Sequence, residues 1–307
     1  MTRTASSPPP AATIALAPKP ARRQWHLPIS IVARIARIVL LVVVAAGFLY
    51  PLLWLLATTF KPRGDVFDNR LIPKTWVFTN FVQVWTKLPL LHWLGNSLLI
   101  AVLAAGFVTI SSSIVAFGFA YFRFPGRNLL FGLIIASMAL PGAVTMIPRF
   151  LIWKELGFLG TNVPLWGANL FGSAFYIFLQ RQFFLGLPRD LFEAARIDGA
   201  SYWGLFRRIA LPLSIPSLII VFIFEFQASW TNLQDGLIYL NLSSANAYTV
   251  PLGISYALNL YSPGNGGNGD YQYVTTAALI VTLPMLLLFA FGQRYFIQGI
   301  ATEGRKG

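Results

Sequence analysis

The sequence has little charge and no cysteine. Only 11% of its 307 residues are Asp, Glu, Lys or Arg, against about 25% in an ordinary soluble domain. So few charges cannot cover an apolar content of 56% in water, and the mean hydropathy of +0.64 agrees. We therefore expect a membrane protein. This composition excludes a disordered chain and a nucleic-acid-binding module, and the lack of cysteine excludes disulfides and thiolate chemistry.

Residues that could carry out catalysis or hold a metal are equally sparse. The only two histidines, His26 and His92, are too far apart for a zinc site of familiar spacing. The chain has no Gly-x4-Gly-Lys-Ser/Thr motif for nucleotide phosphates. It also lacks His-Glu-x-x-His, Gly-x-Ser-x-Gly and any serine–lysine pair at helical spacing inside an apolar run. We expect neither an enzyme nor a cofactor or metal bound by this chain.

Long charge-free runs are the main feature that is present. A helix needs about 20 predominantly apolar residues to cross a membrane. Five runs of that size carry no charge, and a sixth, residues 209–234, carries only Glu225. The sequence therefore predicts an all-α protein with six transmembrane helices, near residues 38–59, 97–121, 129–150, 162–182, 212–232 and 272–292.

The arrangement of Lys and Arg predicts the orientation of these spans. With a cytoplasmic N-terminus, 16 of the 23 basic residues fall in cytoplasmic segments and 7 outside, as the positive-inside rule requires. Both termini are thus predicted to be cytoplasmic. The same rule explains the net charge of +13 without nucleic acid. We expect a multi-pass membrane protein in contact with lipid.

The predicted spans divide the chain into segments. Residues 1–30 are rich in Pro and Ala and resemble a disordered cytoplasmic tail rather than a signal peptide. Residues 31–293 form the membrane domain, and residues 294–307 a cytoplasmic tail with a flexible Gly299–Gly304 segment. Within the domain we expect a cytoplasmic loop at 183–211. Residues 233–271 form a long outer loop without Lys or Arg.

The cytoplasmic loop is strongly patterned. Pro188 suits the start of a helix, in which Arg189, Glu193 and Arg196 line one face as a charge ladder. Asp198-Gly199 indicates a turn in which Gly199 takes a positive φ. Ser201 can cap a second helix after this turn. The sequence predicts a short helix, a tight turn and a second helix that leads into the fifth span.

Two interpretations of the first helix remain open from its spacing. An amphipathic helix can lie on the inner leaflet of the membrane. Alternatively, the small residues Ala194 and Ala195 leave a shallow face that the cleft of another protein can approach closely, with the charges fixing the orientation. Spacing alone does not decide between a surface helix and a docking helix.

The residue pattern resembles a known family. The positions that carry the resemblance are Glu193-Ala194-Ala195, Asp198-Gly199-Ala200, Phe206, Ile209, Leu211-Pro212-Leu213 and Pro216. They are similar to the EAA loop of binding-protein-dependent ABC importer permeases, and the chain is most similar to the second permease of the maltose-type carbohydrate branch. Asn96-Ser97, Phe122 to Arg127 and Gln293 to Gly299 also fit. Near the outer end of the fifth span, Trp230-Thr231-Asn232 departs from the family's usual Trp-Asn sequence.

The resemblance implies partners and a mechanism. It implies a second permease subunit, two cytoplasmic ATPase subunits that use ATP and Mg, and an extracytoplasmic solute-binding protein. The imported solute would be a sugar or oligosaccharide. The residues that it assigns to ATPase docking are Arg189, Glu193, Ala194, Ala195, Arg196, Asp198 and Gly199.

The resemblance also assigns roles to both ends of the domain. The C-terminal tail would contact the ATPases through Gln298, Gly299, Arg305 and Lys306. The outer loop would contact the binding protein, with Tyr256, Asn259 and Tyr261 as candidate contacts.

Glu225 leaves alternatives open because a carboxylate inside a span is costly. It can be a hydrogen-bonded carboxyl packed against a neighbouring helix, or a polar group lining the translocation pathway. A third possibility is a proton-coupled secondary transporter, which the patterned loop opposes because such a protein has no ATPase to dock. Import of another solute, such as a polyol or glycerol phosphate, also remains open.

Overall fold

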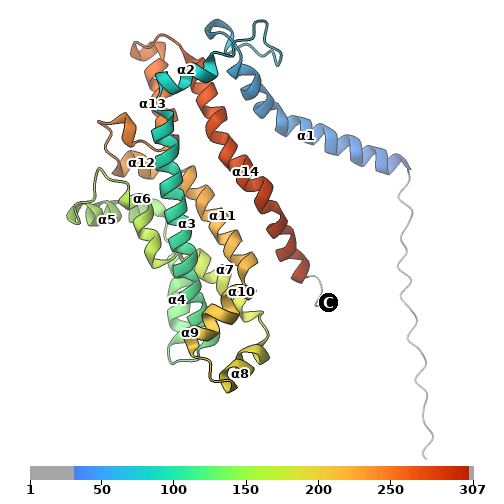
Figure 1. The fold of residues 1–307 in the computed structure, drawn as a ribbon, viewed down its shortest axis with the longest axis vertical. Coiled ribbons are helices and arrows are strands. Elements are labelled where there is room, and N and C mark those ends of the chain that lie inside the picture. Colours follow the sequence, from blue (N-terminus) through green and yellow to red (C-terminus); the bar gives the residue numbers. More distant parts are fainter. Residues whose placement is uncertain (1–30, 304–307) are drawn as a thin grey trace, which may run out of the picture. The chain divides into compact units, whose positions relative to one another are not determined.

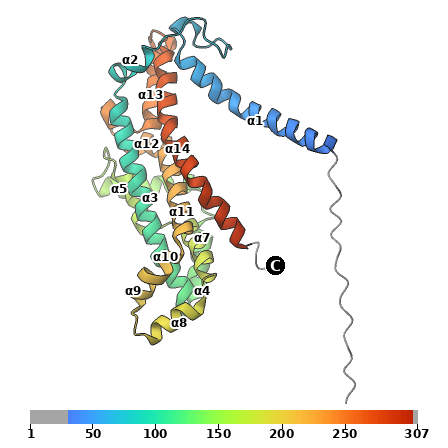
Figure 2. The same ribbon diagram turned by 45° about the vertical axis from the view of Figure 1, so that its right-hand side comes forward.

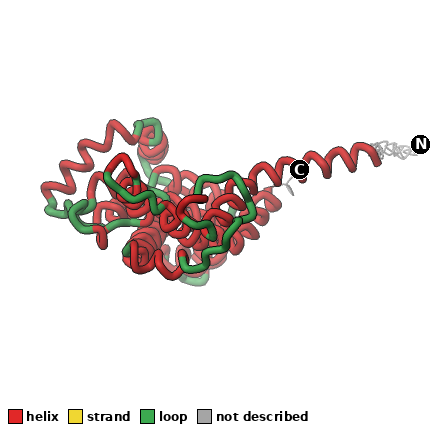
Figure 3. Tube along the Cα trace, turned by 90° about the horizontal axis from the view of Figure 1, so that it is seen from above, coloured by secondary structure: helices red, strands yellow, loops and turns green. Residues whose placement is uncertain are grey.

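In the computed structural model the described residues, 31–303, are predominantly helical, and Figure 3 shows no strand in this part of the chain. The chain divides into two units, residues 1–50 and residues 51–307. The described part of the first unit is the N-terminal portion of α1. The α-helices are α1 (Ile31–Thr59), α2 (Asn80–Lys87), α3 (Leu90–Tyr121), α4 (Arg127–Ser137), α5 (Gly142–Glu155), α6 (Val163–Gly167), α7 (Ala174–Leu185), α8 (Arg189–Ile197), α9 (Tyr202–Leu205), α10 (Leu211–Leu213), α11 (Ile215–Trp230), α12 (Leu233–Tyr239), α13 (Val250–Tyr261) and α14 (Tyr271–Glu303).

Short helical turns join several of these elements. Four are 3-10 turns and η3 is a π-helix: η1 (Arg63–Asp65), η2 (Ala168–Phe171), η3 (Phe206–Ala210), η4 (Ala245–Ala247) and η5 (Pro263–Asn265). An isolated bridge between Gly160 and Leu240 is the one strand-like pairing among residues 31–303.

α3 is the central helix of the second unit. α11 and α7 pack along it, and α2 and α8 lie near its opposite ends (Figures 1 and 2). The face that α3 buries is made largely of small side chains: Ser97, Ala101, Ala104, Ala105, Ser112, Ser113 and Ala116. Small residues let the backbones of neighbouring helices approach closely, which is how helices associate in membranes.

The structure resolves the predicted spans into whole and broken helices. Among the described residues, three helices are long and apolar enough to cross a membrane: Ala33–Thr59 within α1, α3, and Tyr271–Gln293 within α14. Two more spans exist if each of two bent helix pairs counts as one span. One pair is α4 with α5, bent by 98°, and the other is Tyr202–Leu213 with α11, bent by 76°. The predicted span 162–182 is divided among α6, η2 and α7. Six spans and cytoplasmic termini are therefore not confirmed.

Proline accounts for both bends. Pro141 stands directly before α5 with extended backbone, at φ −62° and ψ 137°. Pro216 is the second residue of α11, and Ser214 before it leaves helical geometry at ψ 7°. Proline lacks a backbone N–H and its ring clashes with the carbonyl four residues earlier, which favours a break at these two points. α1, α5 and α14 nevertheless continue through Pro51, Pro148 and Pro284.

Two expected loops differ from the prediction. The outer stretch 233–271 contains α12 and α13, because Pro251 suits the start of a helix and the residues after it are predominantly apolar. The tail after residue 293 continues α14 as far as Glu303, so the expected flexible segment from Gly299 is helical through that residue. A single glycine inside a helix costs only about 1 kcal/mol.

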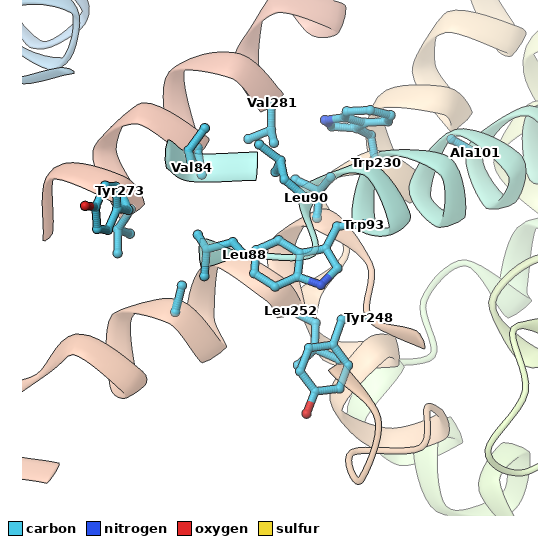
Figure 4. Packing of buried hydrophobic residues seen from close by; sticks show 14 of the residues in the cluster. Val84, Leu88, Leu90, Trp93, Ala101, Trp230, Tyr248, Leu252, Tyr273 and Val281 are labelled. Carbon is cyan, nitrogen blue, oxygen red and sulfur yellow. The ribbon is translucent and has the colours of Figure 1, made fainter. Parts of the chain in front are cut away.

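A buried aromatic cluster fixes α13 against the N-terminal end of α3 (Figure 4). Trp93 is fully buried and its indole N–H donates to the carbonyl of Ala245 at 2.8 Å. Gly253 lies against this ring, and an added Cβ would stand 2.2 Å from Trp93 Cδ2. The close approach of α13 to α3 therefore requires glycine at 253.

We expect Gly253→Ala to destabilise the protein by about 2 kcal/mol, because overpacking costs about 1–3 kcal/mol and outweighs the helix propensity gained. The measurement is the thermal unfolding midpoint in detergent, followed by tryptophan fluorescence. Gly95→Ala is the matched control, because Gly95 is exposed on α3 and has nothing within 4 Å of its Cβ position. An unfolding midpoint for Gly253→Ala equal to that of Gly95→Ala would refute the packing requirement.

Candidate functional site

The helix–turn–helix predicted in the cytoplasmic loop is confirmed. Pro188 immediately precedes α8, which ends at Ile197. Gly199 has φ +82°, and the N–H of Ala200 donates back to the carbonyl of Ala195 at 2.9 Å. The Ser201 hydroxyl then accepts from the N–H of Gly204 at 3.1 Å and caps α9. The turn between the two helices is therefore fixed by local backbone and side-chain bonds.

One phenylalanine anchors α8 to the end of α3. Phe192 is 7% exposed and packs in a cluster with Phe117 of α3, Phe184 of α7 and Phe206 of η3. Its ring centroid lies 6.3 Å from that of Phe117. Ring contacts therefore join α8 directly to the end of α3, and the same cluster includes Phe184 of α7.

The opposite side of α8 is open. Leu191, Ala194 and Ile197 are exposed, and Ile197 is 86% exposed. Ala195 is half-buried and packs toward the phenylalanine cluster. Of the two predicted docking alanines, only Ala194 therefore belongs to the open face, which also carries the exposed Asp198.

The three charged residues of the expected ladder do not pair with one another. Among the described side chains, no ion pair joins Arg189, Glu193 or Arg196. Arg196 instead donates to the carbonyl of Ala200 at 2.8 Å, and its guanidinium lies 4.3 Å from the ring centroid of Tyr202. Arg189 and Glu193 line a cavity between α8 and the end of α3. Arg196 bonds to the turn rather than to Glu193 because the Ala200 carbonyl lies within hydrogen-bonding distance of its guanidinium.

Glu225 lies in a polar cluster between three elements. Its Oε1 atom accepts a hydrogen bond of 2.6 Å from the Asn169 amide of η2 and one of 3.2 Å from the Ser229 hydroxyl. The Asn169 carbonyl accepts in turn from the Ser111 hydroxyl of α3 at 3.1 Å. Glu225 therefore links α11 through η2 to α3, as expected of a hydrogen-bonded carboxyl packed against a neighbour.

The break between η2 and α7 is held by α3 as well. Gly172 has φ +83°, and the N–H of Ser173 donates to the Ser112 hydroxyl at 3.1 Å. A Cβ on Gly172 would lie 3.3 Å from that hydroxyl oxygen. Backbone groups freed by the break are thus bonded by polar side chains of α3, as buried irregular backbone requires.

Near the N-terminal end of α3, Asn96 and Ser97 hold the segment that precedes α13. The Asn96 amide donates to the carbonyls of Asn246 and Tyr248, at 2.8 and 3.0 Å. The Ser97 hydroxyl accepts from the N–H of Val250 at 2.7 Å. The start of α13 is therefore tied to α3 by side-chain bonds to its backbone.

The three candidate binding-protein contacts on α13 lie in different environments. Tyr256 and Asn259 are exposed. Tyr261 is buried, with its ring centroid 6.0 Å from that of Tyr273, and burial raises the pKa of its hydroxyl. Of the three candidates, only Tyr256 and Asn259 are therefore exposed at the surface of the chain.

The C-terminal candidates are only partly described. Gln298 and Gly299 lie on the backbone of α14. Arg305 and Lys306 lie outside the described residues.

Sequence reasoning missed the residues that join these sites. In the sequence, Phe192 is one of several apolar residues in the loop, and Asn169 is a single amide within an apolar run. Ser111 and Ser112 belong to a run of three serines, and none of these positions stands out from its neighbours. A polar residue inside a predicted span is the available signal, because a buried amide or hydroxyl needs a partner.

Comparison with known proteins gives a family match. Residues 110–302 match the family model described as "Binding-protein-dependent transport system inner membrane component". The arabinooligosaccharides transport system permease protein AraQ of Halalkalibacterium halodurans is 32% identical over 84% of this chain and 91% of its own length. The maltose/maltodextrin transport system permease protein MalG of Escherichia coli is 31% identical over 87% of this chain and 94% of its own length.

A solved structure shares the fold. A chain of the bacterial ABC transporter that imports the acidic polysaccharide alginate superposes with a TM-score of 0.73, at 22% sequence identity. The match covers 86% of this chain and 96% of the other.

We expect Asn169→Leu to destabilise the protein by about 1–3 kcal/mol, because it removes a hydrogen bond from a half-buried carboxyl. The check is the thermal unfolding midpoint in detergent. Asn128→Leu is the control, because Asn128 is exposed at the start of α4. Equal midpoints for the two variants would show that the Asn169–Glu225 bond does not hold η2 in place.

Proposed function

This chain belongs to the family of binding-protein-dependent transport system inner membrane components, and from that premise we propose that it is the permease subunit of an ATP-driven importer of a sugar or oligosaccharide. Members of the family are ABC transporter permeases, which are not enzymes. The relatives named for arabino-oligosaccharides and for maltose and maltodextrin support the substrate class. Import of a polyol or glycerol phosphate is less favoured because these relatives are named for sugars.

We place the protein in the cytoplasmic membrane of a bacterium or archaeon with six spans and both termini inside. The 16 to 7 distribution of basic residues supports this orientation. The three whole helices and two bent pairs supply five of the spans. The remaining span is the broken segment α6–η2–α7, whose freed backbone is bonded to Ser112.

The assembled importer needs partners on both sides of the membrane. The description of the family implies a solute-binding protein. A second permease and two cytoplasmic ATPases, which use ATP and Mg, complete the proposed assembly. On the outer side, the exposed Tyr256 and Asn259 are the contacts proposed for the binding protein, with Tyr261 supporting them from beneath.

α8 is the proposed docking helix. The observation that carries this proposal is its two-sided construction, with Phe192 held in the phenylalanine cluster and Leu191, Ala194 and Ile197 open on the other side. An apolar, shallow face of this kind fits the groove of a partner protein. Arg189 and Glu193 border this face, and Arg196 and Asp198 shape the turn at Gly199.

Transport then proceeds by alternating access. ATP binding closes the pair of ATPases and carries α8 with them. Phe192 passes this movement to α3 and α7, while the turn at Gly199 passes it through α9 and η3 to α11. Glu225 on α11 is proposed to border the translocation pathway, where its carboxyl can accept hydrogen bonds from sugar hydroxyls.

The C-terminal end is proposed as a second ATPase contact. Continuation of α14 to Glu303 would carry Gln298 and Gly299 beyond the predicted end of the span. Arg305 and Lys306 add two cations to this end. A proton-coupled secondary transporter is not favoured, because it would need neither these contacts nor a binding protein.

We expect Gly199→Val to abolish sugar uptake while the protein still reaches the membrane. Nothing lies within 4 Å of the Cβ position, so the effect comes from the positive φ, which costs a residue with a side chain about 1–2 kcal/mol and misaligns α8. The measurements are uptake of radiolabelled maltodextrins and arabino-oligosaccharides, and the response of ATPase activity to the loaded binding protein.

Gly199→Asn is the matched control, because asparagine tolerates the left-handed conformation. It should retain most of the uptake. Wild-type transport by Gly199→Val would contradict the docking role of this turn. Uptake of neither sugar class by the wild-type importer would contradict the substrate class alone.

A further inference from the structure

A cavity of about 530 Å³ lies between α8 and the ends of α3 and α7. Three arginines line it: Arg123 and Arg127 from the α3–α4 connection, and Arg189 from the first turn of α8. Phenylalanine and tyrosine rings form much of the remaining wall, from Phe117, Tyr121, Phe122, Phe184, Phe192 and Tyr202. A cavity lined by three arginines and several aromatic rings suits an anionic ligand with an apolar part.

The positive charge of this cavity is not neutralised within the described part of the chain. Glu193 is the only carboxylate in its lining, and no ion pair among the described residues involves the three arginines. Arg127 donates from Nη1 to the Phe122 carbonyl at 3.2 Å, whereas its buried Nε has no hydrogen-bond partner. A buried guanidinium N–H without a partner indicates a missing acceptor.

The first turn of α8 adds further donors. Pro188 precedes this helix and supplies no side-chain cap. The first N–H groups of a helix have no partner within the helix, and they favour phosphate oxygens. Arg189, Phe192 and Glu193 place this turn in the cavity wall. Arginine forks and helix N–H groups together are the donors that phosphate groups bind.

The surface beside the cavity is apolar. A smaller cavity of about 290 Å³ shares Arg123 and Arg127 and continues along Phe124 and Leu129. On α4, Leu129, Leu130 and Leu133 are exposed, Leu129 by 70%. A soluble phosphate compound has no apolar part that would contact such a surface, whereas the acyl chains of a lipid can lie along it.

We propose that this cavity binds the phosphate headgroup of an anionic phospholipid. Its acyl chains lie along α4, and its phosphate joins the α3–α4 connection to the first turn of α8. The topology proposed above would place this lipid in the cytoplasmic leaflet. That placement rests on the proposed function, whereas the binding of the lipid does not. The lipid thereby holds the docking helix against the membrane end of α3.

The test uses the assembled transporter in nanodiscs of phosphatidylcholine with increasing phosphatidylglycerol. Native mass spectrometry counts the phosphatidylglycerol molecules retained by the complex. Arg123→Gln removes a cation whose side chain makes no hydrogen bond within residues 31–303, and Arg123→Gln/Arg127→Gln removes a second cation, which donates to the Phe122 carbonyl. Arg207→Gln/Arg208→Gln is the control, because both arginines are exposed on η3 outside the cavity lining and the charge change is equal.

We expect the double variant to lose about tenfold in phosphatidylglycerol affinity, because two charge-assisted contacts are removed. The single variant should show a smaller loss and the control less than twofold. Equal retention by the double variant and the control would overturn the proposal. Loss of phosphatidylglycerol on addition of millimolar inorganic phosphate would overturn the assignment to a lipid, since a soluble anion would then occupy the site. Both readouts measure lipid binding and not transport. The lipid proposal can therefore be refuted independently of the proposed sugar uptake.

Discussion

The close packing of α3 against α11 and α7 is the interaction on which the rest of the structure depends. The hydrophobic effect does not drive apolar helices together inside a lipid bilayer, so helix association relies on close van der Waals contact and hydrogen bonds. The small side chains along α3, among them Ala101, Ala104 and Ala105, permit that contact. Larger residues occur at its ends, where Trp93 and Phe117 each begin an aromatic cluster. α3 therefore connects α13 at one end and α8 at the other through one continuous helix.

Polar side chains on α3 make broken helices possible. The chain leaves helical geometry at Gly172, where the backbone loses its regular bonds. Ser112 accepts from one freed N–H, and Ser111 donates to the carbonyl of Asn169. Asn169 then bonds Glu225 on α11. An irregular stretch between helices is tolerated at membrane depth only when it is bonded in this way, so the serines of α3 and the carboxyl of α11 depend on one another.

The sequence predicted local features well and distant contacts poorly. A positive φ at Gly199 and the cap at Ser201 depend on residues within the turn, and the structure confirms both. The apolar runs that form α3 and α14 could be predicted from amino-acid composition alone. The Asn169–Glu225 bond joins residues 56 positions apart, and no periodicity reports such a pair. Arg196 turned toward Ala200 because a nearby carbonyl competes with its helical neighbours. Pro141 marks a break in the chain, but the 98° angle depends on the packing of the helices beside it.

The central claim is that the open face of α8 meets an ATP-hydrolysing subunit while its other face is held by α3. Photo-crosslinking from single positions of the assembled importer tests this most directly. Benzoylphenylalanine replaces either Ile197, which is 86% exposed, or Phe192, which packs against Phe117. We predict that the probe at Ile197 yields an adduct containing peptides of the ATPase, whereas the probe at Phe192, which also lines the cavity beside α8, yields crosslinks within this chain or to lipid and none to the ATPase. An importer that transports sugar with the probe at Ile197, yet gives crosslinks to lipid and none to the ATPase, would contradict the account.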